Sequence, residues 1–151
     1  MSFLDALSVS ASALTAERAR MDVTAENLAN AQTTRTEAGG PYRRKVVALE
    51  SVGGQGGFGA ALQSAMGPTG AAGGPSGGVQ VAGITEDSTP AQRVYDPGHP
   101  DADAQGYVEM PNVDTVEEMV DLISSSRAYE ANVTAMQATK GMFAKTLDLL
   151  R

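Results

Sequence analysis

Apolar residues recur every seven positions in two segments at opposite ends of this chain, about residues 3–30 and 115–149. Alternating spacings of three and four place such residues on one stripe of a helix. We therefore expect two long amphipathic helices that pair with each other as a coiled coil. In the first, the main row is Leu7, Leu14, Met21 and Leu28, and Leu4, Ala11 and Ala25 fill the companion row. In the second, the main row is Leu122, Tyr129, Met136, Phe143 and Leu150, and Met119, Val133 and Leu147 fill the companion row.

The second segment also carries a helix start signal. Thr115 and Glu118 fit the T-x-x-E pattern of a capping box directly before the apolar repeat. Ser125 falls off the main stripe, so we expect an acidic residue to be tolerated there. Both helices keep apolar residues beyond the stripes, namely Val9, Ala13, Ala16, Val116, Val120 and Ile123. Such an excess is typical of an assembly subunit, although it could instead cover the middle segment of a monomer.

Between these helices the sequence favours short strands and turns. Residues 51–78 contain no charged side chain, and 11 of the 28 are glycine, which predicts a flexible loop. We expect a mainly α fold with a small β-rich insert. Residues 1–32 and 112–151 would form a discontinuous coiled-coil domain, and 33–111 a middle segment that contains the loop. The expected strands lie at about 42–49, 79–84, 92–95 and 107–110.

Composition excludes several classes of protein. The chain has no cysteine, which removes disulfides, thiolate metal sites and cysteine nucleophiles. The net charge of −7 comes wholly from residues 79–151. The segment from Glu86 to Asp121 contains ten acidic residues and a single basic one, Arg93. That balance argues against nucleic-acid binding. We expect no transmembrane helix, because no apolar run approaches ~18 residues. An N-terminus with Asp5 and no basic residue also argues against a cleaved signal peptide.

Candidate chemistry is sparse. The single histidine, His99, lies in a Pro-Gly-His-Pro sequence beside Asp96, Asp101 and Asp103. The carboxylates of these aspartates could serve as oxygen ligands for a metal, but a structural turn is the preferred interpretation. The basic run 42–45 is interpreted as a strand edge protected by charge. No phosphate-loop, nucleophile-elbow, zinc-protease or dinucleotide fingerprint is present. We expect no enzyme, cofactor, metal, small-molecule substrate or nucleic acid.

Two stretches carry a resemblance to a known family. Residues 12–16 and 20–31, with Asn27-Leu28-Ala29-Asn30 at their core, resemble the N-terminal signature of flagellar rod and hook proteins. Residues 94–132 resemble more specifically the members that build the proximal rod. This second stretch contains Asp96, Pro97, His99 and Pro100. Together the resemblance covers about two-thirds of the chain.

The resemblance implies a structural axial subunit of the bacterial flagellar basal body. Its terminal helices would pair and stack into the hollow, periplasm-spanning rod that transmits torque. Its partners would be other rod proteins, the adaptor at the membrane ring and copies of itself. The flagellar type III apparatus would export it without a cleaved signal. A soluble helical adaptor or export chaperone that binds partner helices is the alternative. An axial subunit should polymerise as its concentration rises, whereas an adaptor should stay monodisperse.

Overall fold

The computed structural model describes residues 3–37, 39–52 and 77–149. In chain order, one long helix precedes four short strands and a second long helix follows them. Most of the predicted glycine-rich loop lies outside these residues, as do Leu150 and the side chain of Leu4. The first helix was expected over about 3–30, the last over 115–149, and two strands at 92–95 and 107–110; the structure confirms these positions. The elements are α1 (Phe3–Ala29), β1 (Lys45–Ser51), β2 (Val79–Glu86), β3 (Gln92–Tyr95), β4 (Tyr107–Met110) and α3 (Thr115–Leu149).

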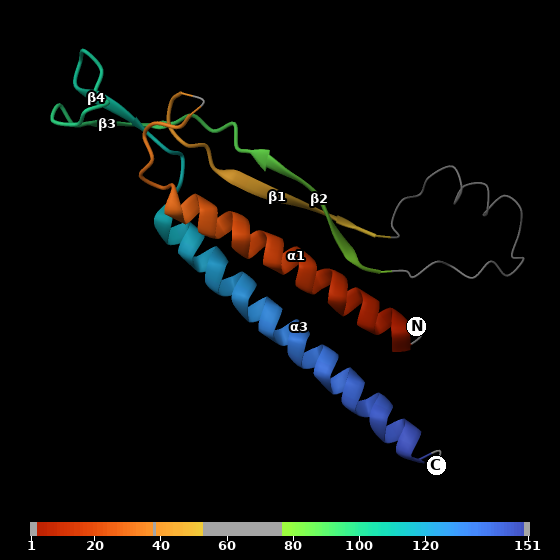
Figure 1. The fold of residues 1–151 in the computed structure, drawn as a ribbon. Coiled ribbons are helices and arrows are strands. Elements are labelled where there is room, and N and C mark those ends of the chain that lie inside the picture. Colours follow the sequence, from red (N-terminus) through yellow and green to blue (C-terminus); the bar gives the residue numbers. More distant parts are fainter. Residues whose placement is uncertain (1–2, 38, 53–76, 150–151) are drawn as a thin grey trace, which may run out of the picture.

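The strands form two separate antiparallel hairpins. β1 pairs with β2, from Lys45 opposite Glu86 to Ser51 opposite Val79, with a register shift between Ala48 and Leu49. β3 pairs with β4, with Tyr95 opposite Tyr107 at the end of the ladder. The second hairpin stands at the end of the molecule where α1 finishes and α3 begins (Figure 1). The fold class expected from the sequence, mainly α with a small β-rich insert, is confirmed.

Helices α1 and α3 run antiparallel and pack along each other, and the β1–β2 hairpin packs on α1 as well (Figure 1). Asn27 on α1 and Glu118 on α3 are hydrogen-bonded, which fixes the pairing register. In that register the first residue of α1 lies opposite residue 142. The last seven residues of α3 therefore extend past α1 by about 10 Å, at ~1.5 Å per residue.

The buried face of α1 differs from the predicted stripe. Buried positions are Ala16, Val23, Thr24 and Asn27, whereas the main row of Leu7, Leu14, Met21 and Leu28 is half-buried. Ala11 and Ala25, predicted to lie in the companion row, are exposed. The reason is that α1 has two neighbours on different sides, α3 and the β1–β2 hairpin. A heptad count assumes one partner, so it does not show which positions of this helix are the most buried.

Helix α3 buries a face centred on Glu118 and Ser125. Leu122, Tyr129, Val133 and Met136 flank that face and are half-buried. Ser125 is 1% exposed, so the expectation that it lies off the stripe and tolerates a charge is wrong. Met119, Phe143 and Leu147 are exposed in the single chain. Their assignment to subunit packing stays a prediction.

The start of α3 also differs from the predicted capping box. Asp114, one residue earlier, accepts hydrogen bonds through Oδ1 from the backbone N–H groups of Val116 and Glu117. Asp114 is therefore the N-cap, and Thr115 is the first helical residue. Glu118 turns inward instead of reaching back to the helix start. None of the described helices has the length and apolar character needed to cross a membrane.

Candidate functional site

A buried polar cluster joins α1, α3 and β1 at the end of the molecule where α1 ends and α3 begins. Its centre is Asn27, which is 2% exposed. Asn27 Nδ2 donates to Lys45 O at 2.9 Å and to Glu118 Oε2 at 3.1 Å. Its Oδ1 accepts from Lys45 N at 2.9 Å and from Tyr42 Oη at 3.0 Å. Both amide hydrogens and both lone pairs are thus used, so Asn27 fits this position without an unsatisfied group.

Glu118 brings a carboxylate into the same cluster and is 1% exposed. Its Oε1 accepts from Arg44 Nε at 2.5 Å, and Arg44 Nη2 lies 3.8 Å from Asp121 Oδ2. The hydrogen bond to Glu118 raises the pKa of Arg44, with the negative charge of Glu118 acting in the same direction. A buried charge is costly unless it is paired and hydrogen-bonded, and this pair meets both conditions.

The backbone of Arg44 extends the cluster into the loops. Its N–H donates to Asn112 Oδ1 at 2.9 Å, and its carbonyl accepts from Asp87 N at 2.7 Å. Asn112 Nδ2 in turn donates to Thr89 O at 3.3 Å. The segment before β1 is therefore tied to the segments on either side of the β3–β4 hairpin.

Two neighbouring side chains complete the cluster. Lys45 Nζ donates to Glu26 Oε1 at 2.5 Å, and this hydrogen bond raises the pKa of Lys45. Burial raises the pKa of Tyr42, and the negative charge of Glu26 adds to the effect. The interpretation of the basic run as a protected strand edge is therefore wrong for Arg44 and Lys45. Both cations bind carboxylates of the helices, and they neutralise part of the chain's acidity.

The Asn-Leu-Ala-Asn element ends α1. Asn30 Nδ2 donates to Glu26 O at 2.9 Å, and Asn30 Oδ1 accepts from Thr33 Oγ1 at 3.2 Å. The second asparagine therefore satisfies a carbonyl of the last helical turn and shapes the exit, as helix C-termini require. Leu28 is half-buried and Ala29 exposed. The two asparagines of the motif hence have different tasks, one inside the cluster and one at the helix end.

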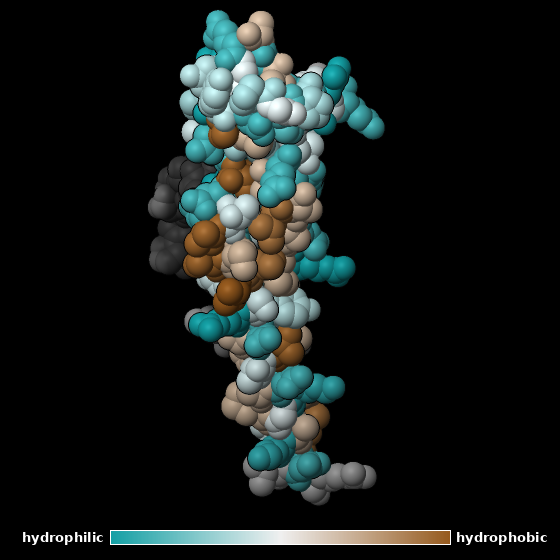
Figure 2. Space-filling view, turned by 90° about the vertical axis from the view of Figure 1, so that its left-hand side faces the viewer, coloured by the Kyte–Doolittle hydropathy of each residue, from teal (hydrophilic) through white to brown (hydrophobic). Residues whose placement is uncertain are grey.

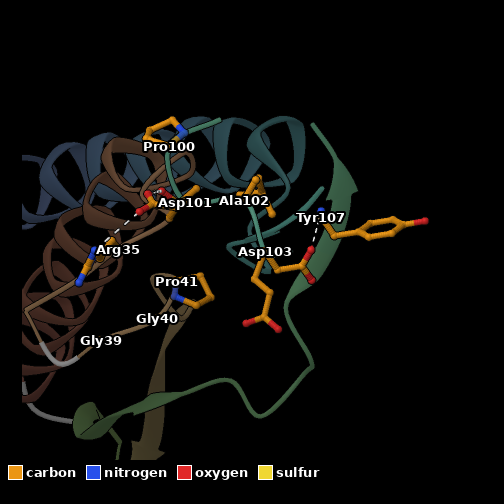
Figure 3. Close-up of a pocket in the computed structure, with 12 residues that line it drawn as sticks. Arg35, Gly39, Gly40, Pro41, Pro100, Asp101, Ala102, Asp103 and Tyr107 are labelled. Carbon is orange, nitrogen blue, oxygen red and sulfur yellow. Dashed lines mark hydrogen bonds and ion pairs between the residues drawn. The ribbon is translucent and has the colours of Figure 1, made fainter. Parts of the chain in front are cut away.

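The exit from α1 meets the β3–β4 loop at a pocket of about 500 Å³ (Figure 3). Thr34 Oγ1 donates to Asp101 Oδ2 at 2.8 Å, and Arg35 Nη1 lies 3.9 Å from Asp101 Oδ1. Gly39, Gly40 and Pro41 line the other side. The residues of this pocket hold two loops together.

The β3–β4 loop is a self-supporting turn, as expected from its sequence. Asp96 Oδ1 accepts from Gly98 N at 3.0 Å, and His99 Nδ1 accepts from Asp101 N at 3.1 Å. The lone histidine is thus a turn residue, flanked by Pro97 and Pro100. Within the described ranges no group of three histidine, aspartate or glutamate side chains could hold a metal ion.

Asp103 closes the same loop. Its Oδ1 accepts from the backbone N–H groups of Gln105 at 2.8 Å and Tyr107 at 3.0 Å, and its Oδ2 accepts from Arg93 Nη2 at 3.0 Å. The hydrogen bond from Tyr107 N, followed by that from Gln105 N, lowers the pKa of Asp103. Gly106 follows with φ +81°, a conformation that glycine adopts without strain.

Exposed apolar side chains form the other candidate site. On α3 they fall into two groups, Val116, Met119, Val120 and Ile123 near its start and Met142, Phe143 and Leu147 near its end. The face seen in Figure 2 shows hydrophobic surface gathered about the middle of the molecule and smaller areas further toward the C-terminal end. Contiguous exposed apolar surface of this kind marks interaction sites.

Sequence reasoning missed the polar cluster and found its parts separately. From the sequence, Asn27 was assigned to the family motif, Glu118 to a capping box and Arg44 to a strand edge protected by charge. The available signal was a polar residue, Asn27, spaced four after the apolar Val23 on one face of the helix. That signal is weak, because many helices carry such residues on their solvent side.

Two family models match the chain at its ends. The model described as "Flagella basal body rod protein" matches residues 7–35, which hold most of α1 and its exit. The model described as "Flagellar basal body rod FlgEFG protein C-terminal" matches residues 104–149, which hold β4 and α3. The matched segments thus contain the helix pair, Asn27 and Glu118.

Curated relatives match along the whole chain. The flagellar basal-body rod protein FlgC of Bacillus subtilis is 55% identical over 153 residues, covering 99% of this chain and 99% of the relative. The FlgC proteins of Borreliella burgdorferi and Escherichia coli O6:H1 are 43% and 42% identical, covering 100% and 99% of this chain and 99% and 98% of the relatives. The resemblance to rod proteins is confirmed, and the chain belongs to the FlgC family of flagellar basal-body rod proteins, which are structural subunits of the rod and not enzymes.

Proposed function

We propose that this rod subunit assembles through the exposed apolar faces of its paired helices, against other rod proteins and copies of itself. Residues 1–32 and 112–151 would act as the assembly unit, and 33–111 as the attached middle segment. The observation that carries the proposal is the row of large apolar side chains that α3 leaves uncovered although it is already paired with α1. Such side chains gain free energy when a neighbour covers them, at about 25 cal/mol per Å².

The polar cluster supports this role by making the assembly unit stiff. Asn27, Glu118 and Arg44 connect two helices and a strand through buried hydrogen bonds. A subunit that transmits torque must keep the angle between its elements under load. Buried polar networks that are fully satisfied favour one packing arrangement over others. Export by the flagellar type III apparatus and contact with the adaptor at the membrane ring belong to the same proposal.

The experiment compares two neighbouring substitutions on α3, Ile123→Glu and Ser124→Glu. Both side chains are exposed in the single chain, so neither variant should lose its fold. Ile123→Glu places a charge within the first apolar group, and it should abolish rods and motility. Ser124→Glu should leave both intact. Circular dichroism confirms that both variants fold, and secretion of the subunit confirms export. Normal motility with Ile123→Glu would contradict the proposal.

A further inference from the structure

The β3–β4 hairpin stands apart from the helix pair. Among the described helices and strands, β3 and β4 pack only on each other. Figure 1 shows the hairpin at the end of the molecule where α1 finishes and α3 begins, beyond the length of both helices. Its two strands therefore add little to the packing of the helices, and their outward side chains are open to a neighbour.

The ladder of this hairpin separates an inner face from an outer one. Val94 lies opposite Val108, and Val108 is 1% exposed, which marks the inner face. Side chains alternate between the two faces along a strand, so the residues on either side of these valines lie on the outer face. We call that outer face the tyrosine face; it consists of Arg93, Tyr95, Tyr107 and Glu109.

The two tyrosines of this face are exposed and yet held in place. Tyr95 is 63% exposed and Tyr107 is 40% exposed, and their rings meet edge to face with centroids 5.3 Å apart. Gly106 packs so closely on Tyr95 that a Cβ atom there would lie 2.9 Å from Cε2 of the ring. Side chains that are ordered before binding lose little entropy on binding, and tyrosine is among the residues that contribute most to interfaces.

Tyr107 already shows which chemistry this surface accepts. The guanidinium carbon of Arg93 lies 5.0 Å from the centroid of the Tyr107 ring, and its Nη2 lies 3.0 Å from Asp103 Oδ2. An aromatic ring attracts cations to its face, and here a carboxylate holds the same cation from another side. Figure 3 shows the Tyr107 side chain pointing away from the neighbouring pocket. A ring and a carboxylate thus bind one guanidinium at the surface.

Tyr95 offers the same two kinds of group to a cation from outside. Within the described part of the chain no cation lies over its ring. Asp96 follows directly and accepts a hydrogen bond from Gly98 N, but it has no ion pair among the described residues. Glu109 lies opposite Arg93 in the ladder, whereas Arg93 binds Asp103. One ring and two carboxylates are therefore available.

The charge of the chain indicates where such a cation comes from. Residues 92–110 carry four acidic residues against one basic residue, an excess of three negative charges. A second copy of the chain has a net charge of −7, so it is repelled at long range. Residues 53–76, which lie outside the described part, have no charged side chain to offer. The complementary surface is therefore a basic patch on a different protein.

We propose that the tyrosine face, together with Asp96, docks a different protein through a lysine or arginine that lies over Tyr95 as Arg93 lies over Tyr107. Tyr95, Asp96 and Glu109 contact the partner. Asp103 is a positioning residue, because it holds both Arg93 and the backbone of Tyr107. The proposal does not depend on the exposed faces of the helices, which Ile123→Glu tests separately.

Cross-linking in the cell tests the contact. Tyr95 is replaced by the photoreactive p-benzoylphenylalanine, which keeps an aromatic ring at this position. Motile cells are irradiated, and mass spectrometry identifies the peptide that is joined to the chain. We expect one site on a different protein, beside a lysine or arginine. Glu109→Lys should lower the yield of this cross-link by at least about tenfold, because like charges across an interface repel each other.

A charge swap and a matched control complete the experiment. Changing the partner's lysine or arginine to glutamate should restore the yield in the Glu109→Lys chain. Glu50→Lys, at an exposed strand position of the other hairpin, should leave the yield unchanged. If Glu109→Lys builds no basal bodies although circular dichroism shows that it folds, recovery of motility by the same swap supports the contact. Failure of the swap to restore yield or motility counts against it.

Three results would overturn the proposal. The first is a cross-link to another copy of this chain, and the second is a yield that Glu109→Lys does not change. The third is no cross-link at all in motile cells that contain the photoreactive chain. If that chain builds no basal bodies, the photoreactive residue is placed at the exposed position of Glu109 instead, and the partner's charge change alone should then lower the yield. An unchanged yield there would also overturn the proposal.

Discussion

Asn27 and Glu118 lie 91 positions apart in the sequence and share a hydrogen bond of 3.1 Å inside the molecule. Both side chains are almost fully buried. The bond connects the end of α1 with the beginning of α3, so it sets the register of the two helices. That register in turn determines how far α3 extends past α1.

The first prediction concerns Asn27→Ala. The substitution removes four hydrogen bonds and leaves Tyr42, Lys45 and Glu118 with unsatisfied groups in a buried site. Each such group costs about 1–3 kcal/mol, more when it is charged, so the free energy of unfolding should fall by several kcal/mol. Urea unfolding followed by circular dichroism measures the change. Asp22→Ala, at an exposed position of the same helix, is the control and should change it by less than about 0.5 kcal/mol.

The second prediction concerns alkaline pH. Folding raises the pKa values of Tyr42 and Lys45, from ordinary values of 10.0 and 10.5. The unfolded chain therefore loses these protons at lower pH than the folded chain does. The stabilisation is fully present below about pH 10 and is lost as the pH rises through the folded pKa values. Unfolding free energies measured from about pH 8 to about pH 11 should stay level at first and then decline, because both groups contribute to the loss.

Tyr42→Phe distinguishes the two groups. The variant lacks the phenol and its bond to Asn27, so it should be less stable at neutral pH. Its stability should also decline less steeply above about pH 10, where the phenol of the native chain titrates. An unchanged slope would show that Tyr42 does not contribute to the alkaline loss.

The secondary structure could be predicted from the sequence because its signals are local. The heptad repeat predicted both helices. The turn residues and the alternation of apolar side chains placed β3 and β4 at the residues observed. The cluster around Asn27 could not be predicted, because it depends on how three distant segments meet. The most buried positions of α1 could not be predicted either, since the pattern does not reveal that the β1–β2 hairpin packs against this helix.

The N-cap illustrates the same limit at short range. Both Asp114 and Thr115 are good capping residues, and the T-x-x-E pattern favoured the second. The pairing of Glu118 with Arg44 and Asn27 draws its carboxylate into the interior, so Asp114 caps the helix instead. A tertiary contact thus decided between two local alternatives.

The third prediction compares two glycines. Gly106 has φ +81°, and a Cβ atom there would lie 2.9 Å from Tyr95 Cε2. Gly106→Ala should therefore destabilise the β3–β4 hairpin, by about 1–3 kcal/mol for the strained backbone alone. Gly141 lies within α3, and apart from the nearby backbone of its own helix no atom of the described residues lies within 4 Å of an added Cβ. Gly141→Ala should stabilise the chain by about 0.5–1 kcal/mol. Thermal unfolding of both variants tests this comparison. A shift of the melting temperature in the same direction in both variants would contradict this account.

The fourth prediction concerns acidic pH at the β3–β4 loop. Folding lowers the pKa of Asp103 from its ordinary value of 3.8, through hydrogen bonds from the backbone of Tyr107 and Gln105. The carboxylate supports the turn above that value, and the support is lost as the pH falls through the lower folded pKa. Amide exchange at Gln105 and Tyr107 should accelerate there. In Asp103→Asn the exchange should be faster already at neutral pH, while amides of α1 stay unchanged.

The fifth prediction separates folding from assembly by comparing Ser125→Glu with Leu147→Glu. Ser125 is 1% exposed, and within the described part of the chain its hydroxyl has no hydrogen-bond partner. An acidic side chain there would be an unpaired buried charge, which costs several kcal/mol, so Ser125→Glu should unfold the chain or greatly weaken it. Leu147 is 52% exposed near the end of α3, so Leu147→Glu should keep the stability of the single chain and abolish rods and motility.

Ser125→Ala and Gln137→Glu are the matched controls for this comparison. Ser125→Ala removes a buried hydroxyl without a partner, so the free energy of unfolding should stay the same or rise, since an unsatisfied buried group costs about 1–3 kcal/mol. Gln137 is exposed in the middle of α3, and Gln137→Glu should affect neither folding nor motility. Circular dichroism and urea unfolding measure the first effect, and swimming with electron microscopy of basal bodies measures the second. A folded, secreted Leu147→Glu subunit that still builds a working rod would show that the end of α3 takes no part in assembly, because a charge there cannot be covered by an apolar neighbour without cost.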